Sequence, residues 1–209
     1  RVNSLPPAEI EKAMQTTRDA TMTLSRYERH QILNKMADAI DERVEEISLM
    51  ITDESGLSLT DTMYEASRVA DVLRFSAIRT YDDDSQVFPC DISKNGRKRR
   101  VYTTRIPLKL IACITPFNHP MNQVVHKIAP AIATNNTVIL KPSERTPLSS
   151  YYLAKLALDC GLPPHMLNVV NGPVKETCDL LVRSELVSMI SFTGSTEIGK
   201  DIANNCGYK

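Results

Sequence analysis

Short apolar runs alternate with helical segments from residue 107 onward, and this alternation limits the fold more than any other feature of the sequence. Repeated strand–helix–strand units are typical of parallel sheets, because two parallel neighbours need a long crossover connection between them. The sequence therefore predicts an α/β fold in which a parallel sheet is wound with helices. The expected strands are 108–115, 137–140, 168–170 and 187–192, and the expected helices are 121–134, 148–160, 174–183 and 197–205.

The first 80 residues are expected to be helical. Apolar side chains recur every three or four positions over residues 25–55, which predicts one long amphipathic helix that ends at Gly56. A second helix is expected to begin at Thr60 or Asp61. We expect residues 1–90 to form front helices that pack on the sheet. The apolar stripe of the second helix consists of Ala66, Val69, Ala70, Leu73 and Ala77.

A hairpin is expected between the helical segment and the sheet. Residues 91–105 are interpreted as two strands around Asn95-Gly96, a dipeptide that tolerates positive φ and favours a type I′ turn. One interpretation of the basic residues here is nucleic-acid binding. A solvated hairpin whose charges protect an exposed edge from aggregation is favoured. The basic residues are Lys94, Arg97, Lys98, Arg99 and Arg100.

The overall composition argues against two further classes of protein. The 25 Lys and Arg residues balance 25 Asp and Glu residues, whereas an electrostatic nucleic-acid binder needs a basic excess. No apolar run approaches the roughly 20 residues of a membrane helix. The opening of the sequence also lacks the apolar segment of a signal peptide. We therefore expect a cytoplasmic protein that binds neither nucleic acid nor membrane.

The cysteines predict neither a disulfide framework nor a metal site. Their number is odd and none forms a C-x-x-C pair, so reduced thiols are expected. Cys113 lies in an expected strand, and Cys178 and Cys206 lie in expected helices. Inert thiols are therefore favoured over a catalytic role. The full set is Cys90, Cys113, Cys160, Cys178 and Cys206.

Ligands of parallel α/β sheets bind beyond the carboxyl ends of the strands, so the residues after each expected strand form the candidate site. After the first strand, a proline-containing turn presents Asn118, whose amide suits a developing oxyanion or caps the next helix. After the second strand, Lys141 and Glu144 suit a ribose diol or form a surface ion pair. After the last strand, Gly194 and Ser195 suit a phosphate or begin a helix. No G-x-G-x-x-G follows the first expected strand.

The combination of these loops and their spacing is specific to one family. Over essentially all of its own length, the chain resembles the amino-terminal half of an aldehyde dehydrogenase superfamily member. The resemblance implies a Rossmann-like NAD(P)-binding domain over residues 107–209. It also implies that residues 91–106 belong to an oligomerisation arm of a homodimer or homotetramer. The motifs are Ile114-Thr115-Pro116-Phe117-Asn118-His119-Pro120, Leu140-Lys141-Pro142-Ser143-Glu144 and Phe192-Thr193-Gly194-Ser195.

The resemblance implies a role for several of these residues. Asn118 would be the oxyanion-hole amide, Lys141 and Glu144 would hold the adenosine ribose, and Ser195 would lie at the pyrophosphate. NAD is the expected cofactor because a carboxylate repels the 2′-phosphate of NADP, although NADP use stays open. Further cofactor contacts are expected from Thr115, Pro116, Phe117, Ser143 and Gly194.

The resemblance also implies the reaction. A Cys thiolate would attack an aldehyde, hydride would pass to the nicotinamide, and a Glu-activated water would release the carboxylic acid. Both that Cys and that Glu are expected beyond Lys209. We therefore expect a fragment without its catalytic domain, inactive by itself.

Segments 63–72, 87–92 and 118–120 are similar to the phosphonoacetaldehyde dehydrogenase branch. Alignment with the family places Arg68 and His119 at the aldehyde pocket, where their donors suit a phosphonate, phosphate or sulfonate. A helix-surface ion pair is the competing interpretation of Arg68. A short anionic aldehyde is therefore the expected substrate. Three alternative interpretations of the chain stay open. They are a lactaldehyde or glyceraldehyde-3-phosphate enzyme, an acylating CoA-dependent relative and a non-catalytic fragment.

Overall fold

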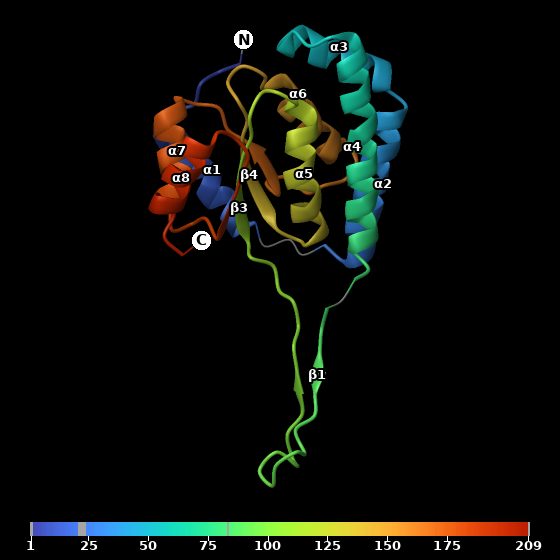
Figure 1. The fold of residues 1–209 in the computed structure, drawn as a ribbon, viewed down its shortest axis with the longest axis vertical. Coiled ribbons are helices and arrows are strands. Elements are labelled where there is room, and N and C mark those ends of the chain that lie inside the picture. The colour runs from blue at the N-terminus through green and yellow to red at the C-terminus, as the bar shows by residue number, and fades with distance from the viewer. Residues whose placement is uncertain (1, 21–23, 83, 209) are drawn as a thin grey trace.

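Layers of helices enclose a parallel sheet in the computed structural model, which describes residues 2–20, 24–82 and 84–208 (Figure 1). The strand order is β5-β4-β3-β6, and all neighbouring pairs are parallel. These strands agree with the expected ones to within two residues at each end, so the predicted α/β fold is confirmed. They are β3 (Leu110–Ile114), β4 (Thr137–Lys141), β5 (Leu167–Val169) and β6 (Met189–Phe192).

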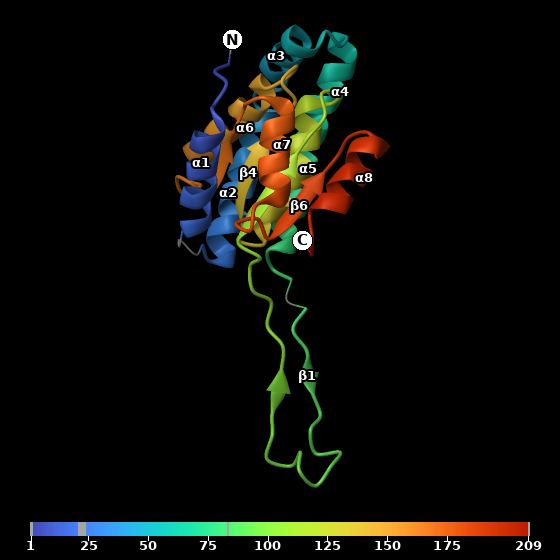
Figure 2. The same ribbon diagram turned by 90° about the vertical axis from the view of Figure 1, so that its left-hand side faces the viewer.

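Helices cover both faces of the sheet, as expected for parallel strands. Ile111 and Cys113 belong to the core shared with α5 (Pro120–Ala133) and α6 (Leu148–Asp159). The alternate β3 residues belong to a second core with α1 (Pro7–Asp19) and α7 (Val174–Arg183). Figure 2 views the sheet from the side of α1, α7 and α8 (Thr196–Asn205).

Three front helices form an outer layer against α5 and α6 (Figure 1). The predicted stripe of the second helix is fully buried, and it faces α5 rather than the sheet itself. Ser58 caps this helix through a bond from the Asp61 backbone N–H, so it begins slightly earlier than predicted. The helices are α2 (Arg26–Asp41), α3 (Val44–Ser55) and α4 (Leu59–Arg79).

The predicted single helix over residues 25–55 is wrong, because the chain turns between α2 and α3. Arg43 has φ −128° and ψ 21°, which lies outside the helical region. The turn lets Ile47 and Ile51 of α3 join the core beside α4 and α6, where both are fully buried. Burial of each such side chain contributes about 1.5–3 kcal/mol, which favours the turn over a straight helix. The predicted end at Gly56 is confirmed, with a left-handed φ of 75°.

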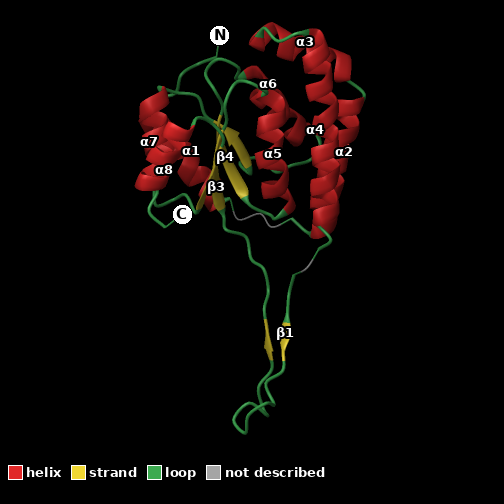
Figure 3. Ribbon diagram, in the orientation of Figure 1, coloured by secondary structure: helices red, strands yellow, loops and turns green. Residues whose placement is uncertain are grey.

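A long hairpin arm projects from the body, and Figure 3 shows that most of it is loop. Its strands, β1 (Val87–Phe88) and β2 (Val101–Tyr102), pair antiparallel. The predicted type I′ turn is wrong: among the described glycines, positive φ occurs at three others and not at Gly96. Gly96 instead packs against backbone, because a Cβ there would lie 1.6 Å from the carbonyl oxygen of Cys90.

None of the helices in the described ranges has the length and apolar character needed to cross a bilayer.

Candidate functional site

The register of the sheet brings the predicted loops to one edge. Ile114 at the end of β3 pairs with Lys141 of β4 and with Phe192 of β6. The Thr115 backbone N–H donates to the Lys141 carbonyl over 3.2 Å, and the Thr193 N–H donates to the Ile114 carbonyl over 3.1 Å. The loops after these three strands therefore start side by side at the carboxyl edge of the sheet.

Lys141 and Glu144 lie together in the loop after β4. Lys141 is buried, and its ammonium donates to the Pro142 carbonyl over 3.0 Å and lies 3.6 Å from Glu144 Oε2. The Glu144 side chain is 51% exposed. A buried ammonium with N–H groups to spare beside an open carboxylate differs from a solvated surface pair and can bind a diol. Ser143 is engaged within the loop, because its Oγ accepts from the Arg145 backbone N–H.

Asn118 lies exposed in the turn between β3 and α5. It is not the cap of α5, because His119 occupies the N-cap position and supplies no side-chain capping bond. The competing interpretation of Asn118 as a helix cap is therefore wrong. Phe117 lies beneath the guanidinium of Arg145, whose central carbon is 4.6 Å from the ring centroid, so the turn contacts the loop after β4.

The loop after β6 begins α8. Ser195 is its N-cap, and its Oγ accepts from the Ile198 backbone N–H over 3.4 Å. Gly194 packs against the ring of Phe192, because a Cβ there would lie 2.4 Å from the ring and the ring would have to move. The capping interpretation of Ser195 is thus confirmed, and a phosphate contact at this helix start stays a prediction.

Sequence reasoning missed Glu65, a carboxylate on α4 that is 2% exposed. Its Oε1 accepts from the backbone N–H groups of Met121 (2.8 Å) and Asn122 (2.9 Å), and so caps α5 from outside that helix. Burial raises the pKa of Glu65, while these N–H donors and His119 oppose the rise. The signal was present in the sequence, because Glu65 precedes Val69 and Leu73 at helical spacing on the apolar face.

Sequence reasoning also missed Lys127, a buried lysine on α5. Its ammonium donates to Ser191 Oγ over 3.2 Å and to Thr193 Oγ1 over 2.8 Å, which ties α5 to the end of β6. Burial lowers the pKa of Lys127. This link helps to hold the loop after β6 at the carboxyl edge.

Of the two residues predicted to bind substrate, Arg68 lies on α4 and His119 is the N-cap residue directly before α5. Arg68 is exposed, and its guanidinium carbon lies 5.5 Å from the centroid of the Tyr64 ring. Glu65 lies three residues before Arg68, but its carboxylate faces α5. His126 of α5 lies near Arg68: partial burial lowers the pKa of its imidazole, and the charge of Arg68 lowers it further. His119 Nδ1 lies 3.5 Å from Glu65 Oε2.

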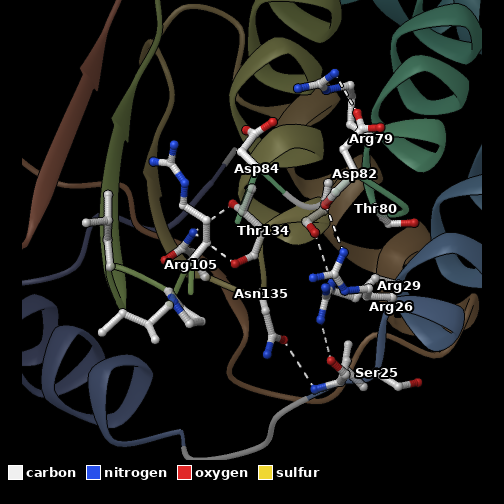
Figure 4. Close-up of a pocket in the computed structure, with 16 residues that line it drawn as sticks. Ser25, Arg26, Arg29, Arg79, Thr80, Asp82, Asp84, Arg105, Thr134 and Asn135 are labelled. Carbon is white, nitrogen blue, oxygen red and sulfur yellow. Dashed lines mark hydrogen bonds and ion pairs between the residues drawn. The ribbon is translucent and has the colours of Figure 1, made fainter. Parts of the chain in front are cut away.

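One cavity lies at the opposite edge of the sheet (Figure 4). Its volume is about 710 Å³, and its lining includes Leu108, just before β3, and Asn136, directly before β4. Arg29 in this cavity donates to the Ala133 carbonyl, and Arg79 pairs with Asp82. These two arginines are thus engaged by groups of the protein itself. We place the candidate site at the carboxyl edge instead, because the predicted loops start side by side there. The described ranges contain no group of three or more His, Cys, Asp or Glu residues arranged for a metal ion.

Comparisons with known proteins agree with this geometry. The model of the aldehyde dehydrogenase family matches residues 1–209. The chain is 35% identical over 202 residues to a 3-sulfolactaldehyde dehydrogenase of Priestia aryabhattai, covering 96% of this chain and 42% of that protein. It is 38% identical over 208 residues to a phenylacetaldehyde dehydrogenase of Pseudomonas fluorescens, covering 96% and 40%.

Solved structures share the fold. The glyceraldehyde-3-phosphate dehydrogenase GapN of Methanocaldococcus jannaschii, in complex with NADP, matches with a TM-score of 0.91 and 30% identity. The match covers 100% of this chain and 46% of that one. The chain thus spans less than half the length of each of these proteins.

The buried thiol of Cys113 yields a first prediction. Burial raises its pKa to about 12, so roughly one thiol in ten thousand is ionised at pH 8. We expect iodoacetamide at pH 8 to leave Cys113 unmodified in the folded protein and to modify it after denaturation, as measured by peptide mass spectrometry. Cys206, which is partly exposed, serves as the labelled control. Rapid native labelling of Cys113 would restore it as a candidate nucleophile.

Proposed function

The chain belongs to the aldehyde dehydrogenase family, and we propose that the full-length protein oxidises an aldehyde to a carboxylic acid with NAD(P)⁺ as hydride acceptor. The observation that carries this proposal is the common origin of three loops at the carboxyl edge of the sheet. They bring Asn118, the Lys141–Glu144 pair and Ser195 to one edge. This is the edge at which α/β sheets of this kind bind their ligands.

The residues at this edge fit a dinucleotide. The buried Lys141 ammonium retains N–H groups for a ribose hydroxyl, and the open Glu144 carboxylate accepts from the same diol. The N–H groups at the start of α8, after Gly194 and Ser195, suit the pyrophosphate. Thr115, Pro116 and Phe117 flank the cofactor in this proposal. Ser143 acts within its own loop. The bound cofactor would supply the hydride acceptor.

Asn118 supports the chemical step in this proposal. Its exposed carboxamide would donate to the oxyanion that develops when the aldehyde carbonyl is attacked. A neutral donor held in a proline-bounded turn needs little reorganisation at that moment, which is the basis of oxyanion stabilisation.

The substrate in this proposal is a short aldehyde with an anionic group, phosphonoacetaldehyde first. Arg68 would bind the anion through its forked donors, and His119, next to Asn118, would add an imidazole donor. The sulfonated substrate of the Priestia relative and the phosphorylated one of GapN support an anionic group. The phenylacetaldehyde relative shows that anionic substrates are not general in the family, so the choice rests on these side chains.

The hairpin arm would join subunits of a homodimer or homotetramer. Its strands are short, and apolar side chains along it are exposed and have no core of their own. A surface of this kind is typical of one that a partner covers. These side chains are Val87, Ile92, Tyr102 and Ile106.

Asn118 provides the test of the proposed function. In the full-length protein, Asn118→Ala should lower kcat for aldehyde oxidation about 100- to 1,000-fold, because one oxyanion donor is lost. The assay is NAD(P)H formation that depends on added aldehyde. Asn34→Ala on α2, whose carboxamide bonds to His30 of the same helix, is the control and should keep its activity. A full-length protein that reduces neither cofactor with any short aldehyde would contradict the proposal.

Glu144 yields a prediction about the cofactor. A carboxylate that accepts from the ribose hydroxyls repels a 2′-phosphate, so the full-length protein should prefer NAD. Glu144→Gln should reduce this preference: the ratio of kcat/KM with NAD to kcat/KM with NADP should fall by about tenfold. Glu11→Gln on the exposed side of α1 is the control. If Glu144→Gln leaves the ratio unchanged, Glu144 does not contact the ribose.

Arg68 yields a prediction about the substrate. Arg68→Ala should raise KM for phosphonoacetaldehyde by about one to two orders of magnitude, because a charge-assisted contact contributes about 1.5–3 kcal/mol. KM for propanal should change much less. Arg74→Ala is the matched control on the same helix, since Arg74 pairs with Asp38 and Asp41 of α2. An equal rise in KM for both aldehydes would mean that Arg68 does not bind the anionic group and is a helix-surface residue.

A further inference from the structure

We propose that Glu65 is a positioning residue, which holds the His119 imidazole from within the protein so that the outer nitrogen of the ring faces the anionic group of the aldehyde. This inference rests on the proposed function. It concerns a residue buried beneath the site, and it explains a feature of Glu65 that capping alone leaves unexplained.

Glu65 is a carboxylate on the buried face of α4. Burying a charged carboxylate costs several kcal/mol unless hydrogen bonds and opposite charge compensate it. Glu65 Oε1 has both kinds of compensation. It accepts hydrogen bonds from the N–H groups of Met121 and Asn122, and these groups lie at the positive end of α5. One oxygen of the carboxylate therefore accounts for the whole cap.

The second oxygen, Oε2, has a different environment. The side chain is 1% exposed, and Oε2 accepts no hydrogen bond from any residue in the described ranges. Buried polar atoms are nearly always hydrogen-bonded, so an oxygen like this one needs a partner. The Nδ1 atom of the His119 imidazole lies 3.5 Å away. This distance is longer than an ordinary hydrogen bond, so the proposal requires the imidazole to move slightly towards Oε2.

The ring geometry determines what this contact does. When Nδ1–H donates to Glu65, Nε2 lies on the opposite side of the ring. The His119 side chain is 48% exposed, so that side is open to a ligand next to Asn118. With a proton on both nitrogens, Nε2–H donates to an anion while Glu65 balances the charge at Nδ1. On α4 and α5, Arg68 lies over the Tyr64 ring, and burial together with the charge of Arg68 lowers the pKa of His126.

Glu54 provides the comparison within the same molecule. It lies on α3 and caps α6, with Oε2 accepting from the Leu148 N–H and Oε1 accepting from Ser149. Both oxygens of Glu54 are thus used by the helix that it caps. Glu65 binds its two N–H groups with one oxygen and directs the other at His119. This difference separates a positioning residue from a cap.

The experiment uses the full-length enzyme and the variants Glu65→Gln, Glu54→Gln, His119→Phe and Glu65→Gln with His119→Phe. Glutamine keeps a carbonyl oxygen for the cap but places an NH₂ group, which cannot accept, against Nδ1–H. We expect Glu65→Gln to raise KM for phosphonoacetaldehyde about tenfold relative to KM for propanal, with little change in kcat. Glu54→Gln should leave this KM ratio unchanged. The double variant should match His119→Phe.

Two results would overturn the inference. One is a fall in Tm of similar size in Glu65→Gln and Glu54→Gln with no change in the KM ratio of either, which would make Glu65 a cap only. The other is an effect of Glu65→Gln that persists in the His119→Phe background, since Glu65 would then act without His119.

A spectroscopic measurement separates this inference from the proposed function. In protein labelled with ¹⁵N-histidine, His119 should show a protonated Nδ1 that is lost in Glu65→Gln. A wild-type enzyme that does not distinguish the two aldehydes contradicts the proposed substrate. The histidine signal then still decides whether Glu65 holds His119, and an unprotonated Nδ1 in the wild type overturns the inference.

Discussion

The in-register pairing of β3 with β4 and with β6 is the constraint on which the rest of the structure depends. Ile114 pairs with both Lys141 and Phe192, so three loops leave the sheet at the same level. A slip of one residue would turn every side chain of a strand towards the opposite core. Because both faces of β3 and β4 are closely packed, such a slip costs apolar burial on each side. The loops that carry the candidate site are therefore positioned by core packing.

The outer helices support the same edge through two buried or partly buried carboxylates. Neither α5 nor α6 has a side-chain cap of its own, since His119 and Pro147 occupy their N-cap positions. Glu65 of α4 and Glu54 of α3 bind the free N–H groups of these helices instead. The start of α5, and with it the turn that holds Asn118, thus depends on a layer that lies far away in the sequence.

Local patterns predicted most of the secondary structure, and the misses have physical causes. Helix 174–183 and the buried stripe of α4 followed directly from apolar spacing and end signals. The turn at Arg43 did not, because the apolar spacing continues across it and only packing against α4 and α6 makes the turn favourable. Asn95-Gly96 carried a strong turn signal, yet Gly96 serves a close approach to the Cys90 carbonyl, a contact that local propensity does not encode.

The sequence by itself determined the parallel α/β fold and the loops that carry Asn118, Lys141, Glu144 and Ser195, because strand and helix periodicity and strand-end position are local properties. It left open whether Asn118 caps a helix and whether Lys141 and Glu144 form a surface pair. Tertiary structure decided the first, since the cap comes from Glu65 on another helix, and it buries Lys141 beside the exposed Glu144. Burial and long-range contacts are properties of the whole chain, so no local pattern of residues contains them.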